Sequence, residues 1–74
     1  MRTETTQFEA SHGRKPRGFG NWFFEVVGTD GNGSFLTVTV EASGRFTEAK
    51  SRAVREFKRD CGQVETVVSV EVLP

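Results

Sequence analysis

Residues 22–40 read WFFEVVGTDGNGSFLTVTV, and this stretch decides the fold. Two apolar runs, Asn21–Val27 and Ser34–Ala42, alternate with a period of two, the spacing of side chains on the two faces of a β-strand. Between them, Gly28–Gly33 contains Asp-Gly and Asn-Gly pairs, which favour the backbone conformations of a tight turn. The sequence therefore predicts a β-hairpin at the centre of the protein.

The composition supports a protein built mainly from strands. The 74 residues include ten valines, eight threonines and seven phenylalanines, types that favour pleated strands. Within the second run, one set of side chains forms the expected core face and the other faces water: Leu36, Val38, Val40 and Ala42 against Phe35, Thr37, Thr39 and Glu41. The first run is apolar on both faces, which predicts a central strand.

A helix and a last strand are expected after a turn at Ser43–Arg45. Thr47 is the predicted N-cap of this helix, and Gly62 is predicted to end it in the left-handed conformation. One apolar stripe recurs at helical spacing, formed by Ala49, Ala53, Val54, Phe57 and Cys61. The final segment, Val64–Leu73, alternates again and is predicted to be a strand.

The first segment, Thr5–His12, alternates weakly and is also predicted to be a strand. The expected fold is α+β: a small, mainly antiparallel sheet of three to four strands with one helix packed on one face, in the order β-β-β-α-β. Residues 1–74 form one domain, with 13–20 a flexible basic loop. The expected core between sheet and helix comprises Leu36, Val38, Val40, Ala53, Phe57, Val68 and Val70.

Charge and residue counts exclude several classes of function and several kinds of site. Ten basic residues balance ten acidic ones, which argues against a nucleic-acid coat protein and against an acidic mimic of DNA. The single cysteine excludes an internal disulfide framework, and with one histidine it leaves a zinc site short of ligands. No apolar run is long enough to span a membrane, so a soluble, cytoplasmic protein without membrane contact is expected.

Catalysis has few candidates in this chain. His12 and Cys61 come from opposite ends of the sequence, and Cys61 lies on the apolar stripe of the predicted helix, where a thiol behaves as a small hydrophobic group. A nucleophile needs a base within reach, and the sequence offers no such pair. We therefore expect no enzymatic activity, no cofactor and no metal.

The segment His12–Gly20 is the main candidate for binding. Arg14, Lys15 and Arg17 stand together here, followed by Phe19 and Trp22, and basic side chains with nearby aromatic rings suit the phosphates and unpaired bases of nucleic acid. Residues 13–18 resemble part of an AT-hook, but Phe19 and Gly20 stand where an AT-hook of this form continues with Arg-Pro. The alternative is a solvated loop that keeps the rim of the sheet soluble.

The second face of the sheet is also a candidate, because one helix can cover only one face. Apolar side chains are expected on the opposite face at Phe23, Val27, Phe35, Val67 and Leu73. Such a surface is typical of an interaction site. The N-terminal segment, a homodimer or a partner protein are the alternatives for what covers it.

Two stretches, residues 12–24 with their basic Pro-Arg-Gly loop and 44–50 with Thr-Glu-Ala-Lys, resemble small phage- and plasmid-encoded accessory proteins. In size and element content the chain is also similar to the small transcription regulator of a Xanthomonas phage. The resemblance implies a phage-type regulator that binds and modulates or inhibits a host protein complex during host takeover, with bacterial RNA polymerase the leading partner. A small nucleic-acid-binding protein is the alternative. Whether it is a monomer or a homodimer stays open. The expected partner-binding residues are Arg14, Lys15, Arg17, Phe19, Trp22, Phe23 and Phe35.

Overall fold

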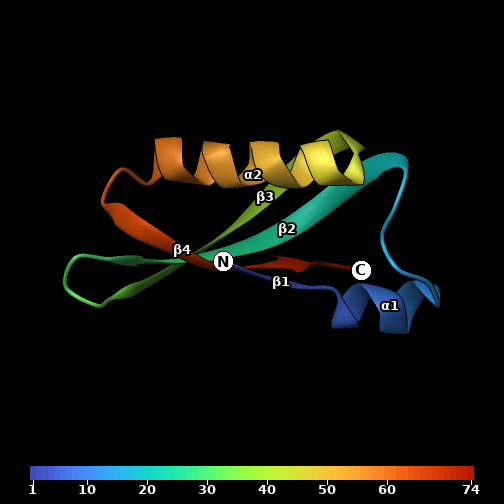
Figure 1. Ribbon diagram of the computed structural model, residues 1–74, viewed down its shortest axis with the longest axis horizontal. Helices are drawn as coiled ribbons and strands as arrows, with labels where there is room; N and C mark the ends of the chain where they lie inside the picture. The colour runs from blue at the N-terminus through green and yellow to red at the C-terminus, as the bar shows by residue number, and fades with distance from the viewer.

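The computed structural model describes residues 1–74 as a four-stranded sheet with two helices (Figure 1). The elements are β1 (Arg2–Glu4), α1 (Thr6–His12), β2 (Phe19–Asp30), β3 (Phe35–Arg45), α2 (Phe46–Asp60) and β4 (Val64–Val72). The strand order is β1-β4-β2-β3; β2 is antiparallel to both neighbours, and β1 is parallel to β4. The predicted α+β class, with a helix across one face of the sheet, is confirmed. Neither helix is long and apolar enough to cross a membrane.

The core lies between α2 and the sheet. Phe57 of α2 sits directly over Gly28 of β2: a Cβ atom on Gly28 would lie 2.9 Å from Phe57 Cε2 and 2.8 Å from Val64 Cγ1. Only a residue without a side chain permits this approach. The buried core comprises Phe8, Trp22, Phe24, Val26, Val40, Ala49, Ala53, Phe57, Val67, Val70 and Val72. The predicted core residues Leu36 and Val38 pack at its margin, partly buried.

The prediction of Val68 as a core residue is wrong. Val68 is 37% exposed, whereas its neighbour Val67 is buried at 7%. The pairing of β2 with β4 shifts between Val27 and Gly28, where Ser69 and Val67 are the successive partners and Val68 is passed over. Such a bulge reverses the faces of the residues beyond it, so Val67 points to α2 and not to the opposite face as expected.

The prediction of a strand over Thr5–His12 is also wrong. The chain forms the short strand β1 and then α1, in which Phe8 stacks on His12, four residues on, at a centroid distance of 4.1 Å. Gly13 ends the helix in the left-handed conformation (φ 70°), with its N–H bonded to Glu9 O. The period-two pattern rests on only two apolar residues, Phe8 and Ala10. It is too short to distinguish a strand from a helix that buries a single residue, Phe8.

Both ends of α2 differ from expectation. β3 continues through Ser43–Arg45 instead of turning there, with Gly44 at φ 116°, and α2 begins at Phe46, so Thr47 is not its N-cap. The N–H of Phe46, the first residue of α2, donates to Gly18 O at 2.9 Å and so continues the pairing between β2 and β3 up to the start of the helix. At the other end, Gly62 does not adopt a positive φ. There, the Cys61 N–H donates to Phe57 O.

The contact between Phe57 and Gly28 yields a stability prediction. Gly28→Ala places a methyl group inside the van der Waals radii of the ring, and we expect it to lower the free energy of unfolding by about 1–3 kcal/mol. The matched control is Gly62→Ala, because a Cβ there meets nothing within 4 Å; it should change stability by less than about 0.5 kcal/mol. Urea unfolding followed by tryptophan fluorescence measures both. Equal stability of the two variants would contradict the packing.

Candidate functional site

The basic loop connects α1 to β2 at one end of the molecule (Figure 1). Its irregular part is Gly13–Gly18, two residues shorter than predicted, because Phe19 and Gly20 already belong to β2. Pro16 is buried, and Gly18 O accepts the N–H of Phe46. The loop is therefore fixed to the fold in its middle and at its C-terminal end, while its three basic side chains are exposed.

Arg45 joins this surface from the end of β3. The hairpin register places Arg45 opposite Phe19, and its guanidinium carbon lies 5.0 Å from the centroid of the Phe19 ring. Phe19 is nevertheless 74% exposed. A shallow groove of about 340 Å³ runs between these side chains, lined by Pro16, Arg17, Gly18, Phe19, Arg45, Phe46 and Thr47. An exposed ring in a groove lined by two arginines can stack on a planar group while the arginines bind anionic oxygens.

We call Arg14, Lys15, Arg17, Arg45 and Phe19 the basic end. Arg14 is held at its α1 side, with its guanidinium carbon 5.7 Å from the centroid of the Phe8 ring. Four of these residues were predicted from the sequence; Arg45 was missed because residues 43–45 were assigned to a turn. Counting the strand register outward from the turn at Gly31–Gly33 would have paired position 45 with position 19.

Trp22, the fifth sequence candidate, is not on the surface. Its side chain is only 5% exposed, and its ring packs edge-on against Phe46 at a centroid distance of 5.1 Å. The indole N–H donates to Gly44 O at 3.0 Å. Trp22 therefore fixes the end of β3 that carries Arg45.

Phe23 and Phe35 lie elsewhere, on the sheet face opposite α2, which we call the open face. They are 42% and 71% exposed. Helix α1 reaches only one corner of this face, where Gln7 Nε2 donates to Glu71 Oε2 at 2.7 Å. The open face thus carries separated aromatic side chains, together with the carboxylates of Glu25, Glu41 and Glu71, all at outward positions of their strands.

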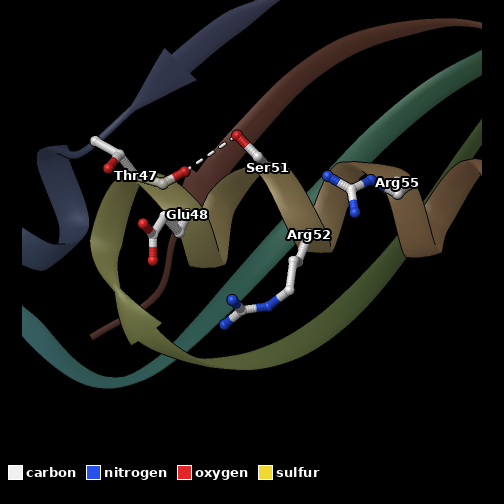
Figure 2. A pocket seen from close by; sticks show the side chains of 5 residues that line it. All are labelled: Thr47, Glu48, Ser51, Arg52 and Arg55. Carbon is white, nitrogen blue, oxygen red and sulfur yellow. Dashed lines mark hydrogen bonds between the residues drawn. The ribbon is translucent and has the colours of Figure 1, made fainter.

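A further concavity, of about 450 Å³, lies along the outer side of α2 (Figure 2). It is lined by Thr47, Glu48, Ser51, Arg52 and Arg55. Arg52 points down from the helix toward β3, where its guanidinium donates to Ser43 O. Ser51 Oγ donates to Thr47 O at 3.1 Å. The concavity contains no apolar side chain, and its arginines continue the positive charge of the basic end along the helix.

His12 and Cys61 are the two side chains that the sequence offered for catalysis. His12 ends α1 and Cys61 follows α2, and these two positions lie at opposite ends of the molecule (Figure 1). No three His, Cys, Asp or Glu side chains are gathered as metal ligands.

Amide hydrogen exchange tests how the loop is attached. The amides of Arg14, Lys15 and Arg17 have no hydrogen-bond partner, whereas the Phe46 amide is bonded to Gly18 O. We expect Phe46 to exchange at least about tenfold more slowly than Arg14 and Lys15, because protection follows from hydrogen bonding and burial. NMR-detected exchange measures this. Fast exchange at Phe46 would show that the loop is not fixed to α2.

No family model, no curated protein and no solved structure matches the chain.

Proposed function

We propose that this protein is a small, non-enzymatic binding protein whose basic end contacts single-stranded nucleic acid. The observation that supports this most directly is the guanidinium of Arg45 over the exposed Phe19 ring, beside a groove that Arg17 also lines. The three cations of the loop, Arg14, Lys15 and Arg17, supply only modest affinity for phosphates by themselves. Arg45 brings the number of cations at this end of the molecule to four.

The geometry favours single strands over duplex. A base can stack on an aromatic side chain only when it is not already stacked between its neighbours in a duplex. Such contacts contribute about 1–3 kcal/mol per base. Phe19 offers one such ring beside a shallow groove. The surrounding guanidinium groups then bind the neighbouring phosphates, which gives affinity with little dependence on base sequence.

Binding of a fluorescein-labelled decathymidine, followed by fluorescence anisotropy, tests the proposal. Arg17→Ala with Arg45→Ala should weaken binding at least tenfold, about 1.4 kcal/mol, because two phosphate contacts are lost. Phe19→Ala should weaken it by a similar factor through the loss of stacking. The melting temperature should stay nearly unchanged, because all three side chains are exposed.

Two matched controls isolate the site. Arg2→Ala with Lys58→Ala removes the same charge from other parts of the surface, and Phe35→Ala removes a ring as exposed as Phe19, at 71% against 74%. Both controls should bind within about twofold of the parent. If the controls weaken binding as much as the basic-end variants, the affinity comes from general charge or hydrophobicity and the proposed site is wrong.

A second candidate function is the regulation of a host protein complex, with bacterial RNA polymerase as the leading partner. The observation that favours it is the open face, where Phe23 and Phe35 are exposed and which also carries Glu25, Glu41 and Glu71. Exposed apolar groups of this kind suit a protein interface, and the resemblance to phage accessory proteins agrees with such a role. The protein would then act in the cytoplasm of the host cell.

Gel filtration with purified bacterial RNA polymerase tests this second candidate. We expect co-elution, and we expect Phe23→Ala with Phe35→Ala to lower the bound fraction at least fivefold, because the central contacts of an interface carry most of its energy. The Arg17→Ala, Arg45→Ala variant should retain binding if the open face is the contact. No co-elution at micromolar protein would exclude the polymerase as the partner.

A further inference from the structure

The outer edge of β3 is long and has no neighbouring strand. β3 lies at one edge of the sheet and is 11 residues long, whereas the opposite edge is the three-residue β1. Its segment Phe35–Val40 contains no charge, glycine or proline. Natural proteins usually protect long edge strands with such residues, because an unprotected edge offers pairing to another chain. This edge is therefore a candidate interaction surface.

The unpaired backbone groups of this edge can be identified. The Asp30 N–H donates to Ser34 O across the hairpin, and pairing alternates along antiparallel strands. Even-numbered residues of β3 thus bond to β2, and the odd-numbered ones direct N–H and C=O outward. Phe35, Thr37, Thr39 and Glu41 have no partner for these groups within the chain, and only Ser43 O is occupied, by Arg52.

Helix α2 places positive charge above this edge. Lys50 donates to Thr3 of β1, so that flank of the helix faces β1, and Arg52 on the other flank reaches β3. Arg55 and Arg59 follow Arg52 at helical spacing, and the three line a concavity of about 200 Å³ together with Glu56. Arg59 is paired with Glu56 and Asp60, whereas Arg55 has no ion-pair partner.

We propose that the β3 edge binds an extended acidic segment of a partner protein, which joins the sheet as a fifth strand. Its backbone would bond to Thr37, Thr39 and Glu41, as in other cases of strand addition. Alternate side chains would face the arginines of α2, which favours carboxylates there. The remaining side chains would lie beside Phe35 on the open face, which favours apolar or β-branched residues.

A second copy of this chain fits the same edge less well. Pairing of β3 with its own copy would place the two α2 helices next to each other on one face of a continuous sheet. Their flanks carrying Arg52, Arg55 and Arg59 would then oppose each other, and like charges repel. An acidic strand meets the same flank with attraction. This proposal is independent of nucleic-acid binding, because it uses neither Phe19 nor the loop.

A capped nonapeptide of alternating Glu and Val, titrated into ¹⁵N-labelled protein, tests the proposal. We expect saturable shifts at the amides of Thr37, Thr39 and Glu41, and at least tenfold slower exchange of these amides. The amides of Val38 and Val40, already bonded to β2, should show no such slowing. The same peptide with Lys in place of Glu should bind at least tenfold more weakly, about 1.4 kcal/mol.

Three variants sharpen the test. Arg55→Glu should weaken peptide binding at least tenfold, whereas Lys58→Glu, the same charge change away from the edge, should bind within twofold of the parent. Thr39→Pro removes an outward N–H that has no partner in the fold, and it should abolish the slowing of exchange. If Thr39→Pro fails to fold by circular dichroism, the two charge variants still decide the matter.

Several results would overturn the proposal. One is the absence of shifts at Thr37 and Thr39 with the peptide at about 1 mM, which would mean a dissociation constant well above about 1 mM. Protection of these amides in the free protein, with a dimer mass by sedimentation, would assign the edge to a second copy. Equal protection by decathymidine would assign it to nucleic acid.

Discussion

The contact between the Phe57 ring and Gly28 determines how the rest of the molecule is arranged. α2 is the only helix across this face, and it approaches β2 closely because Gly28 has no side chain to hold the ring away. The same approach brings Ala49 and Ala53, both fully buried, onto the sheet. In a chain of 74 residues the core is small, so a loss of this packing would release the helix and both ends of the hairpin with it.

The position of α2 in turn shapes the basic end and the open face, the two candidate binding surfaces. The N–H of its first residue, Phe46, donates to Gly18 O, and the Phe46 ring packs against Trp22, so the end of β3 and the end of the basic loop meet at one place. Arg17 and Arg45 come from these two segments. On the far side of the sheet α1 reaches only one corner, which leaves Phe23 and Phe35 exposed. Binding surfaces and core are thus two consequences of one helix placement.

Local patterns were sufficient to predict some parts of this fold and not others. The hairpin follows from long period-two alternation and α2 from an apolar stripe at helical spacing, and the three loop cations lie within four residues of sequence. The N-terminal helix buries one residue, Phe8, and its pattern is too short to reveal its period. The exposure of Val68 depends on a bulge that only strand pairing determines. Arg45 became part of the basic end through the hairpin register, a contact between residues 26 positions apart in sequence.

The dependence of decathymidine affinity on salt tests the central claim most directly. Each phosphate of a single strand that a protein cation neutralises contributes about −0.7 to the slope of log K against log salt concentration. Four cations at the basic end predict a slope of about −3 between 50 and 200 mM NaCl. A slope shallower than about −1 would contradict the account, because it would mean that no more than one phosphate is neutralised and that the basic end is not a nucleic-acid contact.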